Sequence, residues 1–230
     1  EMLTSIIRMG REHTDRSDVK IVNSALKELR HAFGVFAPYG DVPKCAVFGS
    51  ARTKPGTEAY RTAREVGSLL VDADWMVMTG GGPGIMTAVV EGAGPEASFG
   101  VSIVLPFEPG GAEHAALFDG KSINFRYFFS RKLTPTKEAS RYIVFPGGFG
   151  TLDEAYEVLT LIPTGKASMI PVVLLEGAGG AYWEQWQRFT MDGLLARGMI
   201  SPEDLNLYHI AHTPRDAAEH IVRFYRVYHS

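Results

Sequence analysis

Two glycine clusters are the segments of this chain best suited to hold a ligand: Gly80-Gly81-Gly82-Pro83-Gly84 and Pro146-Gly147-Gly148-Phe149-Gly150. Each cluster lies between an apolar run and a segment with helical periodicity, and Gly49-Ser50 follows a third apolar run. The N–H groups of such turns, with the N-terminus of the following helix, bind phosphate. Tight turns also use glycine for conformational reasons. Two proline-marked clusters in one chain nevertheless favour an anion site.

Glu154 lies shortly after the second cluster, in Thr151-Leu152-Asp153-Glu154. The T-x-x-E pattern is typical of a capping box, in which the glutamate accepts a hydrogen bond from the threonine N–H. On the pattern alone, capping is the favoured interpretation. A carboxylate here could instead act on a substrate that the glycine turn holds. Arg131-Lys132 follows an aromatic stretch and, taken alone, is best explained as a solvated basic pair on a helix.

Spacing argues against three better-known kinds of site, which are dinucleotide sites, P-loops and histidine metal sites. Neither glycine cluster has the G-x-G-x-x-G/A spacing of a dinucleotide fingerprint. Residues 115–122 match a relaxed P-loop pattern. A P-loop needs a strand before it and a helix after it, whereas here a polar loop precedes the pattern and Ser122–Phe125 alternates like a strand. The histidines at 209, 212 and 220 form no H-E-x-x-H motif, so we expect no metal site.

The elements that must position these residues alternate along the chain. Short apolar runs predict strands at 44–48, 75–78, 101–105, 142–145, 171–175 and 207–211, and periodic segments predict helices at 57–73, 85–92, 128–139, 151–162, 182–196 and from Pro214. This order predicts an α/β fold whose parallel sheet carries helices on both faces. Ligands of such sheets bind beyond the carboxyl ends of the strands, where the glycine turns fall.

The chain shows no linker or low-complexity segment, so we expect one domain over residues 1–230. Apolar residues at spacings of three and four predict an amphipathic helix over 17–36, with Ser17 as its N-cap. Residues 1–42 are expected to form a helical extension, and residues 43–230 the core that binds the ligand.

Composition argues against nucleic acid and membranes as partners. Lys and Arg number 23 against 26 Asp and Glu, a net charge of −3, so no overall positive field points to nucleic acid. No apolar run approaches the length of a membrane span. The single cysteine, Cys45, lies in an apolar run and is expected to be buried. The first residues show no signal-peptide pattern, and a reducing cytoplasm is the expected location.

At this point the chain resembles the Lonely Guy (LOG) proteins, long labelled "lysine decarboxylase-like". The resemblance rests on Gly80–Met86 and on 146–154, which matches the signature PGGxGTxxE in full. Phe48–Arg52, 105–108, 125–132 and the N-terminal helix are similar to the longer, type II branch. Segments 109–114 and 134–136 depart from that branch, in the region expected to face the base or the ribose.

The resemblance implies a Rossmann-like, doubly wound fold and hydrolysis of the N-glycosidic bond of nucleoside 5′-monophosphates, such as cytokinin riboside 5′-monophosphate or AMP. It implies no cofactor, and a homodimer or larger homo-oligomer in which a neighbouring subunit helps to complete the site. Arg131 and Glu154 fall on the catalytic positions. The implied substrate-binding residues are Gly49, Ser50, Gly80, Gly81, Gly82, Gly84, Met86, Lys132, Gly147, Gly148, Gly150 and Thr151.

Two other functions remain open at this stage. Related folds carry nucleotide-like cofactors such as molybdopterin without consuming them, and a carrier would keep its ligand intact. Amino-acid decarboxylation, suggested by the old label, would normally need a lysine Schiff base with pyridoxal phosphate. No lysine in the sequence lies in a convincing motif for that chemistry.

Overall fold

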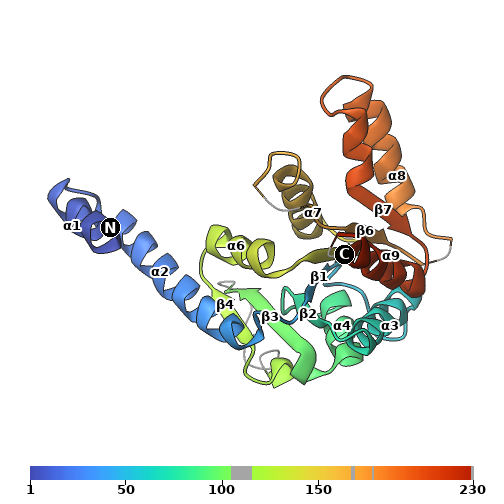
Figure 1. The fold of residues 1–230 in the computed structure, drawn as a ribbon, viewed down its shortest axis with the longest axis horizontal. Coiled ribbons are helices and arrows are strands. Elements are labelled where there is room, and N and C mark those ends of the chain that lie inside the picture. The colour runs from blue at the N-terminus through green and yellow to red at the C-terminus, as the bar shows by residue number, and fades with distance from the viewer. Residues whose placement is uncertain (105–115, 167–168, 178, 229–230) are drawn as a thin grey trace.

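The computed structural model describes the whole chain except residues 105–115, 167–168, 178 and 229–230. Its described strands form one sheet in the order β4-β3-β2-β1-β5-β6-β7, with every neighbouring pair parallel (Figure 1). The strands are β1 (Lys44–Phe48), β2 (Met76–Thr79), β3 (Ser98–Ile103), β4 (Ser122–Phe125), β5 (Arg141–Val144), β6 (Val172–Leu175) and β7 (Tyr208–Ala211).

Helices cover both faces of the sheet. The helices are α1 (Met2–Arg11), α2 (Arg16–Phe36), α3 (Glu58–Asp72), α4 (Ile85–Ala93), α6 (Phe128–Glu138), α7 (Phe149–Leu161), α8 (Tyr182–Phe189) and α9 (Pro214–Tyr228). Buried residues of α3, α4 and α9 share one apolar cluster. Buried residues of α2, α7 and α8, with Ala139 directly after α6, share the other. The doubly wound, Rossmann-like prediction is therefore confirmed.

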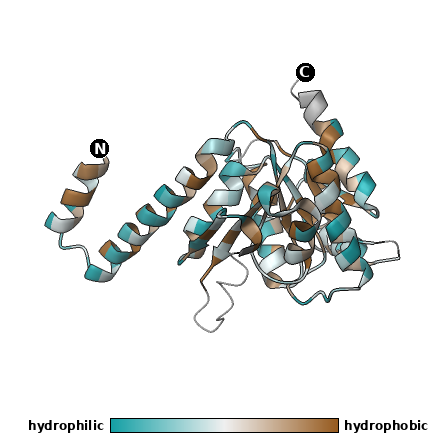
Figure 2. Cartoon of the chain, turned by 90° about the horizontal axis from the view of Figure 1, so that it is seen from below, coloured by the Kyte–Doolittle hydropathy of each residue, from teal (hydrophilic) through white to brown (hydrophobic). Residues whose placement is uncertain are grey.

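Alternate side chains of each central strand feed the two clusters. In β1, Cys45 and Val47 pack toward α3 and α4, while Ala46 and Phe48 pack toward the opposite layer. Successive side chains of a strand point to opposite faces, so a strand buried on both sides must be apolar throughout. This explains why the strands read as continuous apolar runs, and Figure 2 shows them as brown segments inside the molecule.

The strand order reverses next to β1. The chain runs outward from β1 through β2 and β3 to β4, then returns to place β5 on the other side of β1. Where the order reverses, the connections leave on opposite faces, and the carboxyl ends of the strands border a crevice that binds ligands in open α/β sheets. The turns after β1, β2 and β5 meet there.

Most predicted elements are confirmed, with corrections at their ends. The α7 helix begins at Phe149, not near Thr151, and the side chain of Asp15, not Ser17, caps α2. Strand β3 begins at Ser98, earlier than expected. The helix predicted over 182–196 ends at Phe189 and continues as a π-helical turn over Thr190–Leu195. Among the described helices, none is long and apolar enough to cross a membrane.

The N-terminal helices extend away from the sheet as an arm (Figure 2). The last turns of α2 pack on the core through Ala32 and Phe36, whereas Val19, Val22 and Leu26 remain substantially exposed. Farther out, α1 buries no residue at all. The division of the chain into an extension at 1–42 and a core at 43–230 stays a prediction.

Candidate functional site

Three turns from the carboxyl ends of β1, β2 and β5 are tied to one another. The Ser50 N–H donates to the carbonyl of Pro146 at 3.1 Å, which joins the β1 turn to the second glycine cluster. The Ile85 N–H donates to the carbonyl of Ser50 at 3.1 Å, which joins the first residue of α4 to the same β1 turn. The two glycine clusters, distant in the sequence, therefore flank one central turn.

Gly49 and Gly84 are glycines because these turns pack closely. A Cβ on Gly49 would lie 2.7 Å from the Ile85 side chain and 2.8 Å from that of Phe145. A Cβ on Gly84 would overlap the carbonyl of Ser50, and the φ of Gly84 is +72°. Both residues hold the turns together, so neither needs a ligand to explain its identity.

Gly148 and Gly150 have no such internal reason to be glycine. A Cβ built on either would meet nothing within 4 Å, and neither residue has the left-handed φ that favours glycine. Both are exposed, at the start of α7. Glycine is also used where a ligand must approach the backbone closely. These two positions are therefore where the structure leaves room for a bound group.

Arg131 and Glu154 form a buried ion pair beside this open space. Arg131 Nη1 contacts Glu154 Oε1, and the side chains are 9% and 5% exposed. Arg131 Nε also donates to the carbonyl of Val101 at 3.1 Å, which holds the guanidinium against β3. A Cβ on Gly80 would lie 3.1 Å from Arg131 Nη2, so the first glycine cluster passes directly by the guanidinium.

The capping interpretation of Glu154 is wrong. Helix α7 takes Gly148 as its N-cap, and the Thr151 N–H donates to the carbonyl of Gly148 at 3.0 Å. Thr151 is already inside the helix, so Glu154 lies beyond the N-terminal turn and points to Arg131. The interpretation of Arg131 as a solvated residue is also wrong, because its side chain lies on the buried side of α6 and pairs with Glu154.

Burial governs the electrostatics of the pair. Desolvation lowers the pKa of the Arg131 guanidinium, but arginine starts so high that it stays charged at neutral pH. The guanidinium carbon lies 5.5 Å from the centre of the Phe48 ring, an arrangement that favours a cation. A charged pair kept out of water interacts strongly and is costly to break by removing one partner.

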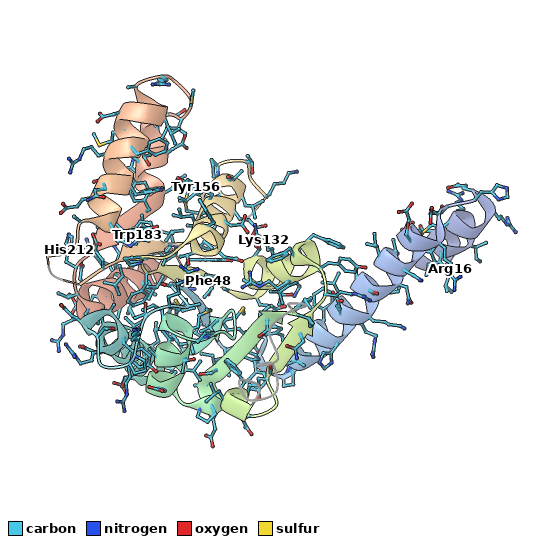
Figure 3. The ribbon with its side chains drawn as sticks, turned by 180° about the vertical axis from the view of Figure 1, so that it is seen from behind. Arg16, Phe48, Lys132, Tyr156, Trp183 and His212 are labelled. Atoms are coloured by element: carbon cyan, nitrogen blue, oxygen red, sulfur yellow. The ribbon has the colours of Figure 1, made fainter. Side chains whose placement is uncertain are left out.

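Lys132 is engaged by two carboxylates of α7. Its Nζ lies 2.9 Å from Asp153 and 3.2 Å from Glu157, on either side of Glu154 along the helix. Figure 3 shows Lys132 on α6 where that helix faces α7. This pairing links the two helices that carry Arg131 and Glu154. The sequence-predicted role of Lys132 in substrate binding stays a prediction, and Asp153 and Glu157 give no pattern that singles them out.

The remaining predicted residues line the two glycine turns. The Met86 sulfur lies 2.9 Å from the place of a Cβ on Gly80, and its methyl group 2.8 Å from that of Gly82. The Gly81 N–H donates to the hydroxyl of Thr79 at 3.2 Å, a contact that the sequence did not reveal. Thr151 packs under the second turn, where a Cβ on Gly147 would overlap its side chain.

Of the two segments that depart from the type II pattern, the structure describes only 134–136. Segment 109–114 lies outside the described residues. Thr134 and Pro135 are buried within α6, and the Thr134 hydroxyl donates to the carbonyl of Ser130 at 3.4 Å. These two side chains therefore pack within the protein, and the expectation that segment 134–136 faces the base or the ribose stays a prediction.

The rejected P-loop pattern is indeed not followed by a helix. Lys121 is buried over the Tyr39 ring, and β4 begins at the next residue.

The histidines near the C-terminus contact one another: His209 stacks on His220 with ring centroids 4.3 Å apart. Within the described ranges, no cluster of three or more His, Cys, Asp or Glu side chains could hold a metal ion.

Comparison with known proteins places this chain in a family. A family model described as "possible lysine decarboxylase" matches residues 84–221, more than half of the chain. No curated protein sequence matches the chain.

Solved structures share the fold. A molybdenum cofactor binding protein from Rippkaea orientalis is 22% identical, with a TM-score of 0.55 over 80% of this chain and 97% of the other. A Moco carrier protein from Chlamydomonas is 20% identical, with a TM-score of 0.51 over 80% and 98%. DNA processing protein A from Helicobacter pylori is 12% identical, with a TM-score of 0.50 over 79% and 80%.

Proposed function

This chain belongs to the family described as possible lysine decarboxylases, the LOG-like family, and from that membership and its site we propose that it is a nucleoside 5′-monophosphate phosphoribohydrolase. The reaction would hydrolyse the N-glycosidic bond of AMP or of a cytokinin riboside 5′-monophosphate. The products would be the free base and ribose 5-phosphate.

The observation that carries the proposal is the buried Arg131–Glu154 pair beside the open start of α7. A phosphate bound at the helix N-terminus would be held by backbone N–H groups and the helix dipole. The sugar of the same nucleotide would then lie within reach of a carboxylate that is kept out of water. A fixed phosphate positions the reacting carbon, and positioning is a large part of catalysis.

The chemistry needs one carboxylate and one water molecule. As the bond between C1′ and the base nitrogen breaks, positive charge develops on the ribose ring, and the Glu154 carboxylate would stabilise it. Water adds its oxygen to C1′, and Glu154 would take the released proton. Glu154 would pass this proton on to the departing base, which regenerates the carboxylate, so one water molecule is added across the broken bond and the atoms and charges balance. Glycoside hydrolysis uses carboxylates in the same two roles.

Arg131 would hold the Glu154 carboxylate in place. Its positive charge compensates the buried carboxylate through the ion pair that the two side chains form. Arg131 contacts Glu154 through Oε1, so the other carboxylate oxygen, Oε2, would be the one that serves the ribose. Arg131 Nη2, beside Gly80, is placed to contact the nucleotide at the same time.

The described lysines do not favour the decarboxylation that the family description suggests. A Schiff base needs an amine that is free to attack a carbonyl group. The amine of Lys132, which lies next to Arg131, is instead held by Asp153 at 2.9 Å and by Glu157 at 3.2 Å. Lys44 is buried, but its Nζ donates to the carbonyls of Tyr39 and Val42 and lies on the opposite end of β1.

A non-catalytic carrier of a nucleotide-like cofactor is the second candidate. It is favoured by the fold shared with the molybdenum cofactor binding protein and the Moco carrier protein. A carrier would use the glycine turns to hold a phosphate and would return its ligand unchanged. The Arg131–Glu154 pair would then serve only as a structural ion pair.

Turnover separates the two candidates. We expect incubation with a panel of nucleoside 5′-monophosphates to release free base and ribose 5-phosphate in equal amounts. Adenosine should react at least about tenfold more slowly than AMP, because it lacks the phosphate that the glycine turns would hold. Recovery of intact nucleotide from a stable complex would support the carrier instead. Comparable rates on AMP and adenosine would refute the phosphate-binding role of the turns.

A further inference from the structure

Glu176 and Tyr182 connect helix α8 to the second glycine cluster. Glu176 follows β6 directly and is buried. Its carboxylate accepts hydrogen bonds from the N–H groups of Tyr182 at 2.9 Å and Trp183 at 3.2 Å, the first two residues of α8. A buried carboxylate at a helix N-terminus satisfies N–H groups that have no partner inside the helix. Glu176 therefore determines where α8 begins.

The placement of α8 brings the Tyr182 side chain to the glycine cluster. The Tyr182 hydroxyl donates to the carbonyl of Gly147 at 2.7 Å. Burial raises the pKa of this hydroxyl above its ordinary value, so it keeps its proton and acts as a donor. The ring of Trp183 packs edge-on against that of Tyr182, with centroids 4.8 Å apart, and Trp183 is fully buried.

The contact at Gly147 controls a peptide that faces the open space. In a trans peptide the C=O and the following N–H point in opposite directions. A hydroxyl that holds the Gly147 carbonyl therefore aims the Gly148 N–H to the other side. Within the described residues, no group accepts a hydrogen bond from that N–H. A peptide between two glycines rotates more freely than any other, so an external hydrogen bond has an effect here that it would lack elsewhere.

The neighbouring carbonyls are held in the same way. The carbonyl of Pro146 accepts from the Ser50 N–H, and that of Gly148 accepts from the N–H groups of Thr151 and Leu152. All three carbonyls of the turn thus accept hydrogen bonds from within the protein, so none of them points to a bound anion and repels it. Of the groups that donate these hydrogen bonds, the Tyr182 hydroxyl is the one that belongs to a side chain.

We propose that Tyr182, placed by Glu176, is a positioning residue that fixes the Gly147–Gly148 peptide so that its N–H faces a bound phosphate. The proposal rests on the function proposed above. It adds that anion affinity depends on a residue of α8, 35 positions after the turn that it controls.

The test replaces Tyr182 by phenylalanine and measures binding of ribose 5-phosphate, the product, by calorimetry alongside AMP kinetics. Loss of one hydrogen bond is expected to raise the Kd for ribose 5-phosphate and the KM for AMP roughly 3- to 15-fold. The kcat should change by less than about twofold, because the ring still fills its place and Glu154 is untouched. Tyr156→Phe is the matched control: Tyr156 lies on α7, and its hydroxyl meets Trp186 rather than the turn (Figure 3).

A second variant tests the link to Glu176. Glu176→Gln keeps the shape of the side chain but offers only one accepting oxygen to the two N–H groups. It should weaken ribose 5-phosphate binding in the same direction, and the double variant should bind no worse than Tyr182→Phe alone. Additive losses in the double variant would refute the idea that Glu176 acts through Tyr182.

The outcomes separate this proposal from the hydrolase proposal. If the wild-type protein hydrolyses AMP and Tyr182→Phe binds ribose 5-phosphate equally well, the role of Tyr182 is refuted and the hydrolase stands. If the wild-type protein releases no base but binds ribose 5-phosphate, and Tyr182→Phe binds it more weakly, the hydrolase is refuted and the role of Tyr182 stands. A wild-type protein that neither releases base nor binds ribose 5-phosphate would overturn both.

Discussion

Gly150→Ala tests whether the start of α7 is kept open for a ligand. Gly150 is the second residue of α7 and is exposed, and an added Cβ would meet nothing within 4 Å. Alanine in a helix is favoured over glycine by about 0.5–1 kcal/mol. For a chain of this size that gain corresponds to roughly 1–4 °C in Tm. If only the folded protein is considered, the substitution should therefore raise its stability.

Judged by the proposed ligand, the same methyl group should be harmful. A phosphate in contact with the backbone would be displaced by about 1 Å, and misplacement on that scale costs up to about 10²-fold in rate. We expect kcat/KM for AMP to fall roughly 10- to 10²-fold, which is about 1.4–2.7 kcal/mol of transition-state stabilisation. Stability and activity should therefore move in opposite directions.

The assay combines thermal melts with initial rates of base release over a range of AMP concentrations. Gly34→Ala is the matched control, because Gly34 is an exposed glycine inside α2 whose added Cβ also meets nothing within 4 Å. It should raise Tm by a similar amount and leave the kinetics unchanged. A Gly150→Ala protein that is more stable and fully active would refute the placement of the phosphate at this turn.

Three further expectations follow from the buried pair, the exposed arm and the buried thiol. Glu154→Gln should still bind AMP but lose roughly 10²–10⁴-fold in turnover. Its Tm should fall, because the buried Arg131 charge loses its partner. Near-normal turnover would show that Glu154 is only a structural partner in the ion pair. Light scattering should find at least a homodimer, and placing two glutamates at Val22 and Leu26, on the exposed apolar face of α2, should weaken it; a monomeric active wild type would contradict this. Burial raises the pKa of the Cys45 thiol to about 12, so iodoacetamide at pH 8 should label it only after denaturation; fast labelling of the native protein would show that Cys45 is accessible.

The sequence by itself determined the class of fold and the place of the glycine turns. These features depend on local patterns: continuous apolar runs suit strands buried on both faces, and glycine clusters mark where those strands pass into helices. The resemblance of segments 125–132 and 146–154 to the LOG proteins also marks Arg131 and Glu154 as the pair of interest. Each of these conclusions uses residues that are near one another in the chain.

Only the tertiary structure decided what those residues contact. The T-x-x-E pattern favours a cap because capping needs four consecutive residues, whereas the actual partner of Glu154 is 23 residues away on α6. The return of the chain from β4 to β5, beside β1, brings α6 and α7 together. The pairing of β6 with β5 lets Tyr182 reach Gly147, although nothing in the sequence near either residue indicates the other. Strand order and helix packing set such distances, and both depend on the whole sheet rather than on any one segment.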